Sequence, residues 1–180
     1  MPSAVDPAER SLHPMAPLIR FTLLALYLAL VLPLPLLAPA GLRTALLLAV
    51  PSGFLLVLAI TSERVELDAE GLRVGHPAWC AWLLRRGWQL GWPAMTALTP
   101  VGTSQGGRVY YVRDAGGGAF LLPQRIDRFE AFLAEFSQRS GLDTSGVGRI
   151  SPPWTYRVLA LLCGLMLAAE LVVGLLGLAR

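Results

Sequence analysis

The sequence predicts an α+β membrane protein: three transmembrane helices and one small antiparallel-β domain closed by a C-terminal amphipathic helix. Three observations favour this fold class. Apolar residues gather in three blocks, at residues 21–38, 44–60 and 156–178. Between the second and third blocks, short segments alternate polar and apolar residues, which is typical of half-buried strands. After them, the segment from Arg125 to Arg139 repeats apolar residues at helical spacing.

The composition agrees with membrane spans. Of the 180 residues, 54% are hydrophobic and 15% are charged, whereas about 25% of a soluble domain is charged. The net charge is +3, and every basic residue apart from the two histidines is arginine. Since the arginines form no basic stripe with interleaved aromatic residues, we expect no nucleic-acid binding.

The first two apolar blocks predict a helical hairpin. Each is near the lower limit for crossing about 30 Å of hydrocarbon, and the four-residue turn 39–42 joins them. Pro33 and Pro35 should kink or fray the first helix, and Pro51 should bend the second. A signal peptide cleaved near Ala38 is an alternative for the first block, but the adjacent second block favours a retained hairpin.

Arginine placement predicts the orientation. Only Arg43 and Arg180 flank the spans on one side, whereas the other side carries Arg10, Arg20, Arg64, Arg149 and Arg157. We therefore expect the domain between the second and third spans on the cytoplasmic side of a plasma or thylakoid membrane, with the C-terminus on the far side. Trp154 and Tyr156 would anchor the third span at the interface.

The water-facing domain should be rich in short strands. Residues 64–68 and 72–74 predict a hairpin around the turn Asp68–Gly71. Residues 88–92 and 95–98 predict two further strands around a bend at Pro93, and residues 109–113 and 119–122 predict a second hairpin.

A helix from Arg125 to Arg139 should close the domain. Its apolar residues share one face and include three phenylalanines: Ile126, Phe129, Phe132, Leu133 and Phe136. Glu135 and Arg139 are spaced to pair on the other face, and Gly141 is a natural end to the helix.

This order of elements resembles bacterial membrane proteins in which a helical hairpin leads into a pleckstrin-homology-like (PH-like) domain. The hairpin Val65–Val74, the segment Trp88–Leu98, the second hairpin and the closing helix carry the resemblance. The plan is also similar to photosystem assembly factors of cyanobacterial thylakoids. The third span departs from both patterns.

The resemblance and the pattern together divide the chain. We expect a flexible N-terminal tail (1–19), a two-helix transmembrane hairpin (20–61), a PH-like domain (62–141), a linker (142–154) and the third transmembrane helix (155–180).

The segment Pro77–Arg86 is the main candidate for a functional surface. Trp79 and Trp82 lie close to Arg85 and Arg86 in what should be a connection. Tryptophan prefers the membrane interface and arginine pairs with lipid phosphate, so this lip is expected to dip into the headgroups or grip a membrane partner. The alternative is that both tryptophans pack in the domain core.

Specific phosphoinositide binding is not expected. It would need basic residues around the first hairpin to meet the phosphate charge. The turn there, Asp68–Gly71, is acidic instead.

Two features of the spans are further candidates. Glu170 lies inside the third span, where a charged carboxylate is costly. It could pair with Arg43 within the chain, contact another membrane protein, or belong to a proton or ion path. Ala160, Gly164 and Ala168 form a small-residue ridge that permits close helix packing, with Glu170 roughly opposite.

The sequence predicts no enzyme. His13 and His76 stand far apart without a nucleophile or paired carboxylates, and Cys80 and Cys163 form no zinc pattern. We therefore expect no cofactor, metal or small-molecule substrate. The expected function is a non-enzymatic scaffold or assembly factor that contacts a membrane protein partner, in one version serving photosynthetic complexes. A lipid-interacting envelope protein that senses the bilayer is the alternative.

Overall fold

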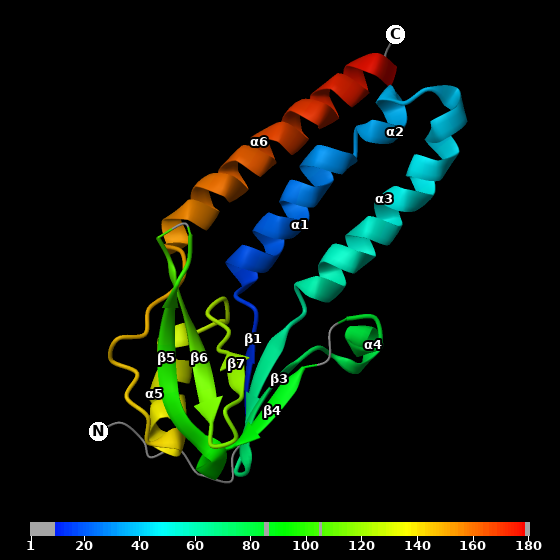
Figure 1. Cartoon of the computed structure of the whole chain (residues 1–180). Helices are drawn as coiled ribbons and strands as arrows, with labels where there is room; N and C mark the ends of the chain where they lie inside the picture. The colour runs from blue at the N-terminus through cyan, green and yellow to red at the C-terminus, as the bar shows by residue number, and fades with distance from the viewer. Residues whose placement is uncertain (1–9, 85–86, 105, 179–180) are drawn as a thin grey trace. The chain divides into compact units, whose positions relative to one another are not determined.

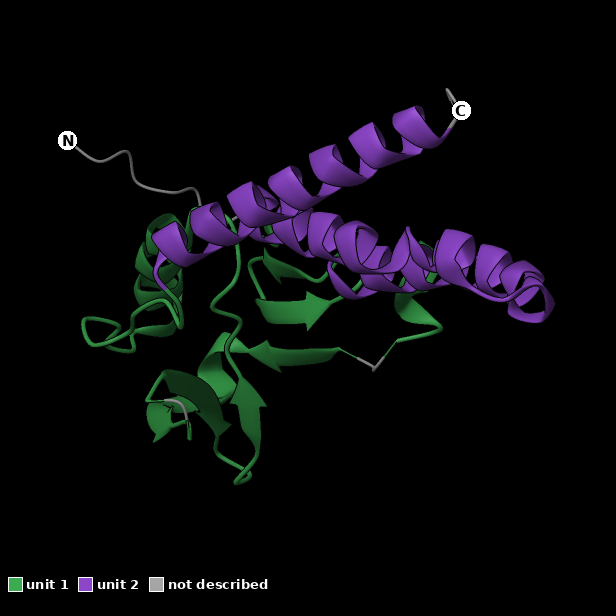
Figure 2. Ribbon diagram, turned by 90° about the horizontal axis from the view of Figure 1, so that it is seen from above, with its two compact units in different colours: residues 1–16, 62–151 green, residues 17–61, 152–180 purple. Residues whose placement is uncertain are grey.

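The computed structural model describes residues 10–84, 87–104 and 106–178, which fall into two compact units (Figure 2). The α+β domain comprises the chain up to Ala16 together with Ser62–Ser151. The helical unit comprises Pro17–Thr61 and Pro152–Arg180. The chain therefore begins the α+β domain, leaves it for the helical segment Pro17–Thr61, and returns to complete it.

The helical unit contains the expected spans. Its elements are α1 (Pro17–Val31), α2 (Leu34–Leu37), α3 (Ala40–Ile60) and α6 (Pro153–Leu178). Three stretches are long and apolar enough to cross a membrane: Pro17–Leu37, Ala40–Ile60 and Pro153–Gly177. The first breaks between Val31 and Leu34, beside Pro33 and Pro35, as predicted. By length and composition, these helices indicate association with a membrane.

Within the helical unit, α1 packs against both α3 and α6 (Figure 1). Tyr27 of α1 donates its hydroxyl proton to the Val50 carbonyl of α3 at 2.7 Å. A Cβ atom on Gly53 would lie 2.3 Å from the same hydroxyl oxygen, so only glycine leaves room for the tyrosine. The helix α3 continues through Pro51 at this contact.

The α+β domain contains two antiparallel sheets (Figure 1). The four-stranded sheet has the order β1 (Ser11–Pro14), β2 (Arg64–Leu67), β3 (Gly71–Gly75), β4 (Trp88–Gly91). The three-stranded sheet has the order β5 (Met95–Gly102), β6 (Arg108–Asp114), β7 (Ala119–Leu121). A one-turn helix α4 (Ala78–Ala81) interrupts the β3–β4 connection, η1 (Trp92–Ala94) joins the sheets, and α5 (Phe129–Ser140) follows β7.

The N-terminal segment corrects the expected flexible tail of residues 1–19. Residues 1–9 lie outside the described part, but Ser11–Pro14 form strand β1, paired antiparallel with β2. Ala16 donates its N–H to Arg125 O at 2.8 Å, and Asp127 donates to Pro14 O at 2.7 Å. Pro14 is tolerated because β1 is the edge strand of its sheet. The segment is therefore held between β2 and the chain that precedes α5.

The closing helix starts later than expected. Residues 125–128 are not helical, because Ile126 forms a β-bridge with Met15 and the neighbouring residues hydrogen-bond to the end of β1. Arg128 takes a left-handed conformation with φ of 45° just before α5 begins. The early start predicted from spacing alone is thus overridden by pairing with the N-terminal strand.

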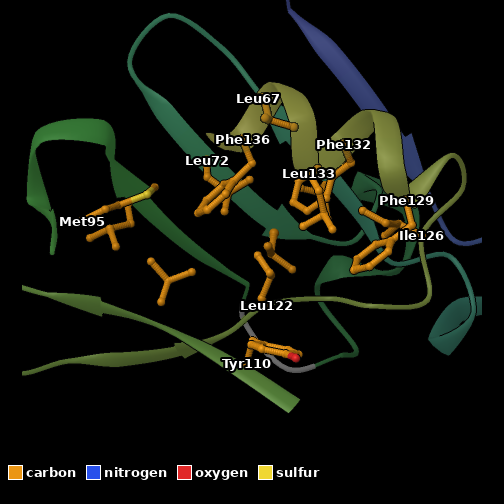
Figure 3. Close-up of a cluster of buried hydrophobic side chains, with 14 residues drawn as sticks. Leu67, Leu72, Met95, Tyr110, Leu122, Ile126, Phe129, Phe132, Leu133 and Phe136 are labelled. Atoms are coloured by element: carbon orange, nitrogen blue, oxygen red, sulfur yellow. The ribbon is translucent and has the colours of Figure 1, made fainter. Parts of the chain in front are cut away.

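The core of the domain lies between the two sheets and α5 (Figure 3). All five apolar residues predicted for the helical face are buried: Ile126, Phe129, Phe132, Leu133 and Phe136. The first hairpin contributes Val65, Leu67, Leu72 and Val74 to the core, and β6 contributes Tyr110 and Val112. The period-2 alternation of the strands and the phenylalanine stripe therefore meet in one core, as the sequence predicts.

Candidate functional site

The register of the four-stranded sheet defines two ends. Arg64 pairs with both Pro14 and Gly75, and Val74 pairs with Trp88. At this end the chain runs from β1 towards α1, arrives from α3 at β2, and makes the β3–β4 connection that carries α4 (Figure 1). We call it the loop end. The opposite end carries the acidic turn Asp68–Gly71 between β2 and β3, and we call it the turn end.

The turn end is closed by hydrogen bonds. The Asp68 carboxylate accepts the N–H groups of Glu70 and Gly71, each at 2.9 Å. The Asp68 carbonyl accepts Trp92 Nε1–H at 3.0 Å and an Arg139 N–H at 2.9 Å. A Cβ on Gly71 would lie 2.3 Å from Leu90 O, which leaves room only for glycine. This acidic turn is occupied by structural contacts.

The loop end presents two exposed tryptophans. Trp79 is 52% exposed, Trp82 is 80% exposed and the neighbouring Leu83 is 53% exposed. Buried Cys80 anchors the segment between them, and Trp82 Nε1 donates to Trp79 O at 2.9 Å. The alternative that both tryptophans pack in the core is therefore wrong. Arg85 and Arg86, the other predicted members of this lip, lie outside the described residues. From here the lip denotes Trp79, Trp82 and Leu83.

A partly buried acid lies beside the loop end. Burial raises the pKa of Glu63, and the nearby charges of His76 and Arg125 oppose this rise. Glu63 is also fixed through its backbone, since its carbonyl accepts the N–H of Met15 at 3.1 Å. His76 is half-buried.

A buried polar cluster fixes β1 against α5. Glu135 accepts a hydrogen bond from Ser11 at 2.6 Å and pairs with Arg139 at 2.8 Å. His13 Nε2 lies 3.5 Å from the same carboxylate, a distance that allows an ion pair when the imidazole is protonated. The predicted Glu135–Arg139 pair forms, but on the buried side, with both side chains at most 10% exposed. His13 also belongs to this cluster, not to the expected flexible tail.

The sequence offered little sign of this cluster. Ser11 and His13 alternate with Leu12 and Pro14 over only four residues, which is too short for a reliable strand assignment. Only the pairing of β1 with β2 places both side chains on the side of the sheet that faces α5.

The candidates in the spans lie in different surroundings. Arg43 is exposed near the start of α3, and no ion pair joins it to Glu170 in the described structure. Glu170 lies on the same half-buried side of α6 as buried Cys163, and among the described residues its Oε2 has no hydrogen-bond partner. Of the small-residue ridge, Ala160 is half-buried, whereas Gly164 and Ala168 are exposed. The ridge is therefore not the side that α6 packs against α1.

Side chains that could ligate a metal are scattered over the part of the chain that the structure describes. Within it, no three His, Cys, Asp or Glu side chains gather closely enough to hold a metal ion. Cys80 and Cys163 are both buried, one in each unit.

The fold and these surfaces define an α+β protein with three apolar helices and an exposed tryptophan lip. No protein-family model matches the chain, and no solved structure matches it. The chain is 39% identical over 174 residues to the uncharacterized protein slr0269 of the cyanobacterium Synechocystis sp., which covers 93% of this chain and 87% of that protein. The chain belongs to the family of that protein.

Proposed function

We propose that the α+β domain is a PH-like domain whose first strand precedes the membrane hairpin. Its four-stranded sheet, three-stranded sheet and C-terminal helix occur in the order that the resemblance implies. The two spans α1 and α3 are inserted between β1 and β2. The hairpin is then inserted within the sequence of the domain, which distinguishes this plan from a hairpin that only precedes the domain.

We further propose that the protein is a non-enzymatic membrane scaffold or assembly factor. The observation that carries this proposal is the exposure of Trp79 and Trp82 at the loop end. There α1 begins three residues after Pro14, and Arg64 follows the end of α3 by four residues. Four residues of chain span at most about 14 Å, so short connections tie β1 and β2 to the proposed spans at the end of the sheet that also carries the lip.

The lip has the chemistry of a protein contact. Tryptophan is enriched among the residues that dominate binding energy at interfaces. Burying one large apolar side chain contributes about 1.5–3 kcal/mol, and here two tryptophans and one leucine lie together within five residues. We therefore assign the lip to a membrane protein partner at headgroup level. A photosynthetic complex is the specific partner class, supported by the resemblance and by the cyanobacterial relative.

The orientation belongs to the same proposal. The excess of arginine on the domain side of the spans supports a cytoplasmic or stromal α+β domain and a C-terminus on the far side. The open ridge of Gly164 and Ala168 would then be available to a partner within the bilayer.

The test is co-purification of the intact tagged protein from its own membranes in mild detergent. We expect one membrane protein or complex in fixed ratio with the wild type, lost from Trp79→Ala/Trp82→Ala. Leu121→Ala is the matched control, because Leu121 is 47% exposed on the other sheet. Identical partners from all three proteins would contradict a role for the lip.

A lipid-interacting function is the second candidate, favoured by the preference of tryptophan for the membrane interface. It predicts that the same purification yields the protein with lipid alone. It also predicts that Trp82 contacts lipid headgroups in protein-free bilayers, which quenching of its fluorescence by headgroup-labelled lipids would detect.

A further inference from the structure

A pocket of about 140 Å³ opens on one face of the four-stranded sheet. Its lining comes from segments far apart in the sequence: Arg10, Arg64, Glu66, Arg73, Gly75 and His76. Arg73 is paired with Glu66 in the sheet register, and Arg64 with Gly75. The neighbouring residues Val65 and Val74 are buried in the core, so period-2 alternation directs these charged side chains to the opposite face.

The charges in this lining do not balance. Glu66 is its only carboxylate and lies between Arg10, with which it pairs, and Arg64, whose Nε is 3.0 Å away. Arg73 donates instead to the neutral Gln89 side-chain oxygen, at 2.7 and 3.2 Å. Within the described lining, three guanidinium groups thus face one carboxylate, an excess of two positive charges.

Two of the arginines have freedom to engage a ligand. The Arg10 side chain is 63% exposed and that of Arg64 is 36% exposed, whereas that of Glu66 is 8% exposed. Because Glu66 also contacts Arg64, Arg10 can turn towards an incoming anion without leaving the carboxylate unpaired. His76 adds a further polar group: among the described residues, its buried Nδ1 has no hydrogen-bond partner.

We propose that this pocket binds a phosphate group, either on an anionic lipid headgroup or as the free ion. Planar guanidinium forks match phosphate oxygens bidentately, and a phosphate carries the charge that the lining lacks. The acidic turn Asp68–Gly71 contributes no residue to the described lining. The site is separate from the lip and does not depend on the proposed partner.

The test measures binding to the full-length protein in mild detergent. Inorganic phosphate and dioleoyl phosphatidic acid are the two probes, titrated by calorimetry and native mass spectrometry respectively, and dioleoyl phosphatidylcholine is the zwitterionic control. We expect Arg64→Gln/Arg73→Gln to weaken binding at least tenfold. Arg10→Gln, at an exposed position, should weaken it several-fold without affecting the fold. Arg108→Gln removes the same charge from an exposed position on β6 and should bind like the wild type.

The outcomes separate the two phosphate sources. Saturable binding of inorganic phosphate with this pattern of variants assigns the site to the ion itself, and binding of phosphatidic acid alone assigns it to a headgroup. The proposal is overturned if neither probe binds, if phosphatidylcholine binds equally, or if Arg10→Gln and Arg108→Gln have the same effect. Trp79→Ala/Trp82→Ala should retain phosphate binding, so a failure of the scaffold proposal remains distinguishable.

Discussion

Both ends of the four-stranded sheet carry tryptophan, but the surroundings of these tryptophans differ. At the turn end, Trp92 and Arg139 both donate to the Asp68 carbonyl, and the indole of Trp92 packs edge-on against Phe136 at 6.1 Å. At the loop end, Trp79 and Trp82 are exposed, and the indole N–H of Trp82 bonds only within its own turn. The presence of tryptophan in a segment therefore does not show by itself that the segment belongs to the core. At one end tryptophan stabilises the fold, and at the other it remains available for contact.

The largest expected loss of stability comes from removing the buried ring that Trp92 contacts at the turn end. Phe136 is fully buried, so Phe136→Ala should destabilise the α+β domain by about 3–5 kcal/mol through lost burial and a cavity. Urea unfolding of the detergent-solubilised protein, followed by circular dichroism, measures this loss. A cost below about 1 kcal/mol would mean that the core is not packed as described.

Removing the buried arginine should have the next largest effect. Arg139→Ala leaves the Glu135 carboxylate buried without its main partner and removes a donor to Asp68 O. Breaking a buried pair in this way costs about 3 kcal/mol or more. The double variant Glu135→Leu/Arg139→Leu should lose less than the sum of the two single leucine substitutions. Additive losses would show that the two side chains do not act as a pair.

Tryptophan removal at the loop end should leave stability almost unchanged. Because Trp79 and Trp82 are exposed, Trp79→Ala/Trp82→Ala should change the free energy of unfolding by no more than about 0.5 kcal/mol. The same urea titration provides the comparison. A loss comparable to that of Phe136→Ala would place the lip in the core and remove the difference between the two ends.

The smallest expected effect concerns the pH dependence of stability at the loop end. Burial raises the pKa of Glu63 above its ordinary value of 4.5. The folded protein therefore holds this proton more tightly than the unfolded chain. The resulting stabilisation is fully present below pH 4.5 and is lost as the pH rises through the folded-state pKa.

Glu63→Gln should remove this part of the pH dependence. Thermal unfolding midpoints measured from pH 4 upwards should fall less steeply in the variant than in the wild type. Identical slopes would contradict the raised pKa. Arg113→Gln, a charge change on β6, controls for general electrostatic effects.

Much of the fold could be predicted from the sequence because its local signals agree with one another. Alternation marked the first hairpin, and the five apolar residues from Ile126 to Phe136 marked the helix face that fills the core. Strand β1 could not be found in this way. It has four residues including a proline, and the contact between Arg10 and Glu66 spans 56 positions.

The surfaces were harder to predict than the core. The sequence around Trp79 and Trp82 was consistent with both an exposed lip and a connection packed in the core. The structure distinguishes the two, because both tryptophans are exposed and Cys80 between them is buried. The arginines of the phosphate pocket come from β2, β3 and the segment before β1. Their convergence depends on strand register across a long insertion, which residue patterns alone do not reveal.

The most direct test of the account is site-specific photocrosslinking from the lip. A photoreactive benzoylphenylalanine replaces Trp82 in the full-length protein, and a matched variant carries it at Leu121, which is also exposed. On irradiation of intact native membranes, the account predicts one discrete crosslinked membrane protein from position 82 and none from position 121. Crosslinking to lipid alone from position 82, or the same products from both positions, would contradict the proposal that the loop end holds a protein partner.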